Sequence, residues 1–127
     1  MILNYLYGWK AAYFTPENYP LKFHYAKIFE KLIGTQFKKG NCTEVVYDNA
    51  FEYIDNNYYY ILDEDDFTFE SILKSAKNLV KTKGINILVL DPYNKIEHQL
   101  NGMSETQYIS KFLDEVIKFA RFNNVLV

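Results

Sequence analysis

Two apolar segments that each end in an acidic residue decide the fold of this chain: Lys10-Ala11-Ala12-Tyr13-Phe14-Thr15-Pro16-Glu17 and Ile85-Asn86-Ile87-Leu88-Val89-Leu90-Asp91-Pro92. Short, continuous apolar runs of this kind are typical of strands that are buried on both faces of a parallel sheet. Such sheets bind ligands in the crevice beyond the carboxyl ends of their strands, so Glu17 and Asp91 can face the same bound phosphates. The pair predicts the core of a nucleoside triphosphatase.

The glycine-rich loop that binds phosphates in such enzymes, G-x-x-x-x-G-K-[ST], occurs nowhere in the 127 residues. Residues 1–8 are similar to the last turns of a helix that is closed by Gly8. We therefore expect residues 1–127 to be a single partial domain, cut from a longer chain, which lacks the phosphate-binding segment.

The predicted elements alternate between strands and helices, with strands over 9–15, 58–62, 85–90 and 125–127, and helices over 20–33, 43–56, 68–83 and 104–122. The last helix begins with Ser104 and Gln107, which have the spacing of a capping box. The order β-α-α-β-α-β-α-β predicts an α/β fold: a parallel sheet with helices on both faces. The inward positions expected for the second helix and the last helix are Val46, Ala50, Phe51 and Ile54, and Tyr108, Ile109, Phe112, Leu113, Val116, Ile117 and Ala120.

Composition excludes several classes of protein. A formal charge of −2 and a pI near 5.7 give no whole-chain signature of a nucleic-acid or membrane surface. The apolar runs are too short for a membrane span, and no signal peptide is evident, so we expect a cytoplasmic protein without a membrane partner. His24 and His98 have no third ligand at metal spacing, which argues against zinc, and the single Cys42 is expected to pack.

Each acid has a catalytic interpretation and a structural alternative. Asp91 ends its strand as a Walker B aspartate does, and would help to hold Mg²⁺ against the nucleotide phosphates. Glu17 would orient and polarise the attacking water. Alternatively, Asp91-Pro92 simply ends a buried strand, and Glu17 is a solvated glutamate near a helix N-terminus. Their order along the chain, with the glutamate before the Walker B strand, favours the catalytic interpretation.

A family resemblance rests on three segments: Tyr13-Phe14-Thr15-Pro16-Glu17-Asn18, then Ile87-Leu88-Val89-Leu90-Asp91-Pro92-Tyr93-Asn94, then a polar loop and Ser104-Glu105 opening a helix. Together they resemble the RecA-like P-loop NTPase core of DnaB-like replicative DNA helicases, a group that includes phage helicase-primases and Twinkle. The resemblance matches Glu17 with the family's catalytic glutamate and Asp91 with its Walker B aspartate. The family's P-loop would precede Met1, and its γ-phosphate sensor and arginine finger would follow Val125.

The resemblance implies a parent protein that uses ATP and Mg²⁺ to translocate on single-stranded DNA and unwind duplexes, as a hexameric ring of identical subunits. A primase is implied as a candidate fused domain or partner, and the source would be a phage or a mobile element. The loop over 92–103 would line the ring's DNA channel, with Asn94, Lys95 and His98 as the residues that bind nucleic acid. We expect the fragment alone to be catalytically inactive and to hold no cofactor.

Two rival interpretations stay open. A recombinase or circadian-clock-type RecA relative would share both acids and need the same missing loop. A complete small α/β binding module would use both acids structurally and bind no nucleotide. If the chain is a fragment, the P-loop strand would belong beside residues 125–127, which leaves an unpaired apolar edge through which the fragment is expected to self-associate.

Overall fold

The computed structural model describes residues 1–127 except 19, 39, 63–67, 92–95 and 97–99. It is an α/β fold whose sheet has the strand order β2-β1-β3. The central strand is β1 (Lys10–Phe14). It pairs in parallel with β2 (Tyr58–Tyr60) on one side and with β3 (Ile85–Leu90) on the other. Leu126 adds a parallel bridge to Ile87 on the free side of β3, so the expected strand over 125–127 is reduced to one bridge. The fold class expected from the sequence is confirmed.

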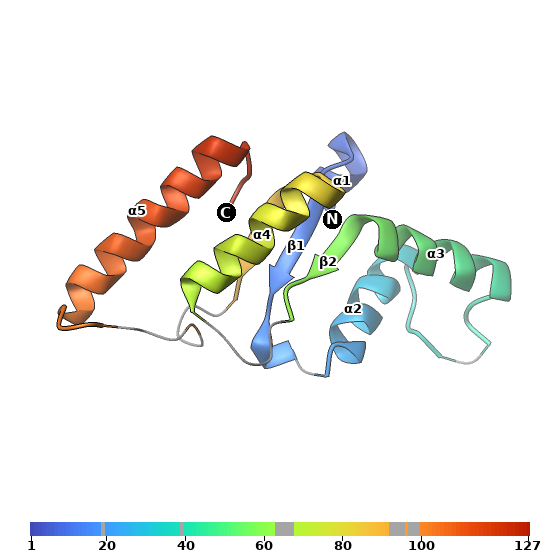
Figure 1. Ribbon diagram of the computed structural model, residues 1–127. Coiled ribbons are helices and arrows are strands. Elements are labelled where there is room, and N and C mark those ends of the chain that lie inside the picture. Colours follow the sequence, from blue (N-terminus) through green and yellow to red (C-terminus); the bar gives the residue numbers. More distant parts are fainter. Residues whose placement is uncertain (19, 39, 63–67, 92–95, 97–99) are drawn as a thin grey trace.

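Helices cover both faces of this sheet (Figure 1). On one face, α4 (Phe69–Lys83) and α5 (Glu105–Asn123) pack over Ala12 and Phe14 of β1. On the other face, α2 (Lys22–Ile33) and α3 (Glu44–Asn57) pack over Ala11 and Tyr13. Because neighbouring residues of a strand point to opposite faces, β1 must be apolar at nearly every position, and this explains its continuous apolar run.

Local chemistry sets the helix ends. Thr43, Thr68 and Ser104 are the N-caps of α3, α4 and α5, and their side chains accept hydrogen bonds from backbone N–H groups in the first turn. The capping box of Ser104 and Gln107 is present, as the sequence predicted. Gly84 ends α4 in the left-handed conformation, with φ of 67°, where a side chain would be strained.

Some predicted boundaries were wrong by one or two residues. Helix α2 begins at Lys22 rather than at Pro20, because Pro16–Asn18 forms a separate 3₁₀ helix (η1) and Leu21 is the N-cap. Strand β2 ends at Tyr60 rather than Leu62, although the N–H of Ile61 still donates to the carbonyl oxygen of Tyr13. The expected helix end before Gly8 is present as α1 (Ile2–Tyr7).

Part of the predicted inward faces was also wrong. On α3 only Ile54 is buried, while Val46 and Phe51 are 44% and 51% exposed. On α5 the buried residues are Tyr108, Phe112 and Phe119, whereas Ile109, Leu113 and Ile117 are exposed. Each helix is buried along a narrower stripe than its apolar pattern suggests; Ala50 and Val116 still pack against the core, and Phe51 lines a groove between α2 and α3. No described helix is both long enough and apolar enough to cross a membrane.

Candidate functional site

The predicted acids lie at the carboxyl ends of two neighbouring strands. Phe14 of β1 is in register with Leu90 of β3, and the N–H of Asp91 donates to the carbonyl oxygen of Phe14 at 2.9 Å. The backbone of Asp91 is therefore held against the end of β1, three residues before Glu17. The sheet brings both acids to one edge, the edge at which parallel α/β sheets bind ligands.

The two carboxylates are presented by different local structures. Glu17 lies in η1, directly after β1, and its side chain is exposed. Asp91 is the first residue after β3 and is also exposed. Both side chains can therefore reach a ligand at the edge without the large energetic cost that burying a charged group would carry.

Thr15 is a feature of this edge that sequence reasoning missed. The residue is only 5% exposed, and its hydroxyl oxygen Oγ1 has no hydrogen-bond partner among the described residues. An unpaired buried hydroxyl costs about 1–3 kcal/mol. Thr15 lies between the end of β1 and Glu17, and its hydroxyl oxygen is buried away from the surface. A threonine within an apolar run gave no signal that its hydroxyl would be unpaired.

His24 of α2, Tyr13 of β1 and Tyr60 of β2 form a cluster. Nδ1 of His24, in the first turn of α2, lies 2.6 Å from the hydroxyl of Tyr60 at the end of β2. The ring of Tyr13 meets the His24 ring edge-on at 5.1 Å between centroids. Burial lowers the pKa of His24, Lys27 and Lys31 lower it further, and the charge of Asp91 opposes them. Burial also raises the pKa of Tyr60 well above its ordinary value.

These shifts define how the cluster is protonated near neutral pH. Tyr60 keeps its proton and His24 is neutral, so the hydroxyl of Tyr60 can donate to Nδ1 of His24. The charge of Asp91 is the smallest of these effects on the His24 pKa, and it places Asp91 within electrostatic range of the cluster. From the sequence His24 was considered only as a metal ligand. His24 lies in the helix that follows the first apolar strand and Glu17. That position in the sequence was the signal that could have placed His24 near the carboxyl ends of the strands.

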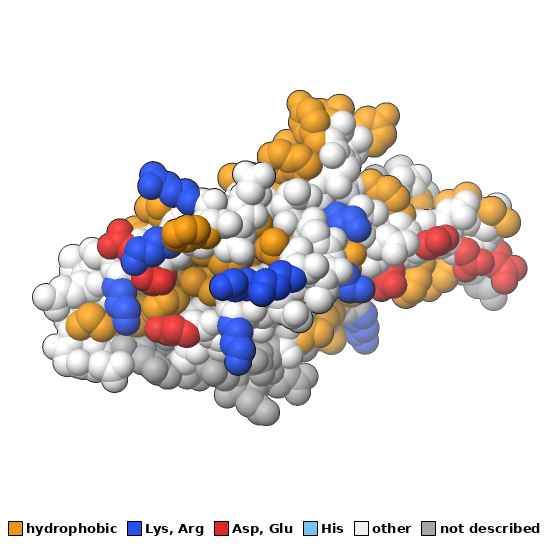
Figure 2. Space-filling model, turned by 45° about the horizontal axis from the view of Figure 1, so that its top comes forward, with side chains coloured by type: hydrophobic (Ala, Val, Ile, Leu, Met, Phe, Trp, Pro, Cys, Tyr) orange, Lys and Arg blue, Asp and Glu red, His pale blue; other side chains and the backbone are white. Residues whose placement is uncertain are grey.

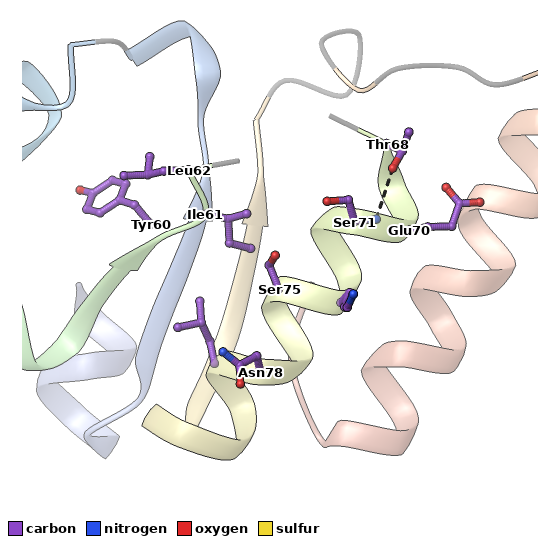
Figure 3. Close-up of a pocket in the computed structure, with 10 residues that line it drawn as sticks. Tyr60, Ile61, Leu62, Thr68, Glu70, Ser71, Ser75 and Asn78 are labelled. Carbon is purple, nitrogen blue, oxygen red and sulfur yellow. Dashed lines mark hydrogen bonds between the residues drawn. The ribbon is translucent and has the colours of Figure 1, made fainter. Parts of the chain in front are cut away.

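A groove of about 880 Å³ lies between the end of β2 and α4 (Figure 3). Ser71, Ser75 and Asn78 lie on the side of α4 turned toward Ile61, while Glu70 extends toward α5. Its lining is hydroxyl and amide rich and includes neither Glu17 nor Asp91. The lining of this groove is therefore separate from the strand-end acids.

Among the described residues, no cluster of three or more His, Cys, Asp or Glu side chains could hold a metal ion. Mg²⁺ does not require such a cluster, since it is commonly bound by one or two carboxylates together with waters and substrate phosphates. Asp91, exposed directly after β3, is a carboxylate of the kind that Mg²⁺ can use in this way. The predicted nucleic-acid ligands Asn94, Lys95 and His98 lie outside the described residues.

The fold and the two strand-end acids define a class of protein: a parallel α/β domain with two exposed acids at the carboxyl ends of adjacent strands. Within that class the chain is similar to the Twinkle homolog protein, chloroplastic/mitochondrial, of Arabidopsis thaliana, with 30% identity over 132 aligned residues. The alignment covers 96% of this chain and 18% of that protein, so the chain spans less than a fifth of its relative. No protein-family model matches the chain, and no solved structure matches it. The similarity supports a helicase-related origin.

Proposed function

We propose that this chain is part of the motor domain of an ATP-dependent replicative DNA helicase of the DnaB-like group. The observation that carries the proposal is the similarity to a Twinkle homolog along 96% of the chain. The parent would couple ATP hydrolysis to translocation on single-stranded DNA and to duplex unwinding, as a ring of identical subunits. A fused or partner primase, a phage or mobile-element source, and the cellular compartment remain predictions from the sequence.

The free edge of the sheet supports a motor domain with further strands. Leu126 pairs with β3 on one side and is 53% exposed. Helix α5, beyond this edge in Figure 1, leaves Ile109, Leu113 and Ile117 exposed. A further strand beside Leu126 would extend the sheet beneath α5 and give these apolar side chains a surface to cover. The proposal places the strand of the phosphate-binding loop there.

The roles of the chain's own residues follow from their positions. Bound Mg²⁺ supplies positive charge that stabilises the transferring phosphate. Asp91 would hold Mg²⁺ through a bound water from the end of β3. Glu17 would accept a hydrogen bond from the attacking water and fix its direction. The segment over 92–103 would contact single-stranded DNA.

The test uses the product of the complete reading frame that encodes this sequence, and measures ATP hydrolysis with and without single-stranded DNA. Glu17→Gln should lower DNA-stimulated hydrolysis by about 100-fold or more, as expected for loss of a general base, while binding of a fluorescent ATP analogue persists. Asp91→Asn should weaken Mg²⁺-dependent nucleotide binding. Glu52→Gln, an exposed acid on α3, is the matched control. Unchanged turnover in Glu17→Gln would remove Glu17 from the mechanism, and absence of any ATP hydrolysis in the unaltered protein would favour a binding module.

A further inference from the structure

Charge is distributed unevenly over the helices. Seven of the chain's 14 lysine and arginine residues lie on α4 and α5, namely Lys74, Lys77, Lys81, Lys83, Lys111, Lys118 and Arg121. These two helices carry four acids, Glu70, Glu105, Asp114 and Glu115, whereas α3 carries acids and no base. Figure 2 shows Lys and Arg side chains over the α4 and α5 part of the molecule, with acidic side chains among them, and further acidic side chains at the α3 end. The α4–α5 layer therefore carries an excess of bases over acids in a chain whose net charge is −2, and α2, with Lys22, Lys27 and Lys31 against Glu30, is the other described helix with such an excess.

A groove of about 700 Å³ lies between α4 and α5. Lys74 and Lys77 line it from α4, and Lys118 lines it from α5. Glu70 and Glu115 also reach it, but Glu115 pairs with Lys118 at 2.8 Å and both partners are well exposed. An exposed ion pair is weak, so Lys118 can exchange Glu115 for a phosphate. The lysines therefore offer contacts on both sides of one groove.

The same groove has an aromatic side chain at its rim. Phe122 of α5 lines the groove and is 88% exposed, more than any other phenylalanine or tyrosine on the described surface. Lysines that follow a groove, together with an exposed aromatic ring, form the pattern of single-stranded nucleic-acid sites, where phosphates meet the lysines and a base stacks on the ring. An acidic peptide would satisfy the lysines but would not require the ring.

We propose that the α4–α5 groove binds single-stranded nucleic acid, with Lys74, Lys77 and Lys118 contacting phosphates and Phe122 stacking on a base. Its lining includes neither Glu17 nor Asp91, and none of the described residues of the segment over 92–103. It is a second contact for a strand, independent of any nucleotide chemistry. Its existence does not depend on the helicase assignment.

Binding of the 127-residue chain to a fluorescein-labelled 20-mer of thymidylate, followed by anisotropy, tests the site. Three phosphate contacts predict that affinity falls by about 20-fold between 50 and 200 mM salt. Lys74→Glu/Lys77→Glu/Lys118→Glu should weaken binding at least about tenfold at 50 mM salt, while the matched control Lys22→Glu/Lys31→Glu/Lys38→Glu, with the same change in net charge, should weaken it much less. Circular dichroism verifies that all variants fold.

The aromatic contact is tested separately. Phe122→Ala should weaken binding about fivefold or more, whereas Phe51→Ala, which removes a half-exposed ring from acidic α3, should leave it unchanged. Equal effects of Phe122→Ala and Phe51→Ala, or full competition by poly-glutamate at equal charge, would overturn the proposal in favour of an acidic protein partner. Binding that is lost in Lys95→Glu/His98→Ala but kept in the triple glutamate variant would overturn it and leave the helicase proposal standing.

Discussion

Thr15→Val is expected to stabilise the chain. The hydroxyl of Thr15 is buried without a partner among the described residues, and valine has nearly the same shape and the same β-branching. Removing an unpaired buried hydroxyl should recover about 1–2 kcal/mol of the desolvation penalty that such a group carries. For 127 residues, an unfolding entropy of about 2.1 cal/mol/K per residue converts this gain to a rise in Tm of about 4–8 °C.

The assay is urea unfolding followed by circular dichroism at 222 nm, with thermal unfolding as a second measurement. Thr68→Val is the matched control, because Thr68 is 7% exposed but its hydroxyl accepts a hydrogen bond from the N–H of Ser71 at the start of α4. The same substitution there should destabilise the chain by about 1 kcal/mol. If Thr15→Val instead destabilises the chain as much as Thr68→Val does, the hydroxyl of Thr15 has a hydrogen-bond partner in solution and is not an unpaired buried group.

Three further predictions concern stability. Because burial lowers the pKa of His24 below its ordinary value of 6.5, the unfolded chain binds more protons between these two pKa values, and the free energy of unfolding should fall as pH drops from 6.5 toward the folded pKa. His24→Gln should remove that part of the dependence in urea titrations from pH 5 to 8; an unchanged profile would contradict it. Ser104→Ala should cost about 1 kcal/mol in the same unfolding assay by removing the N-cap of α5, and no loss would mean that the capping box is not formed in solution. Ile72→Ala, in the core between α4 and the sheet, should cost about 2–5 kcal/mol, and a loss below 1 kcal/mol would argue against this packing.

Features that depend on neighbouring residues in the chain were predictable from the sequence. The capping box at Ser104 and the glycine stop at Gly84 are local chemistry, and both are present. The apolar runs of β1 and β3 predicted parallel strands covered on both faces, because only such strands need apolar residues at successive positions. Their contact with each other follows from the fold class, and it brings Glu17 and Asp91 to one edge.

Features that depend on which surfaces meet were not predictable in the same way. The apolar pattern of α3 and α5 placed Phe51 and Leu113 inward, but a pattern cannot tell how wide a stripe the sheet will cover. The contact between His24 and Tyr60 joins residues 36 positions apart. The contact forms only when α2 packs over β1 and β2. The groove between α4 and α5 likewise combines lysines from two helices that the sequence separates by a strand and a loop.

We propose that Glu17 and Asp91 face one bound nucleotide. The most direct measurement is a crystal structure of the product of the complete reading frame with Mg²⁺ and a non-hydrolysable ATP analogue. We predict that the nucleotide lies at the carboxyl edge of the sheet, with Asp91 bonded to a water of Mg²⁺ and Glu17 beside the terminal phosphate. A nucleotide bound elsewhere, with both carboxylates in bulk solvent, would show that Glu17 and Asp91 do not form a nucleotide site.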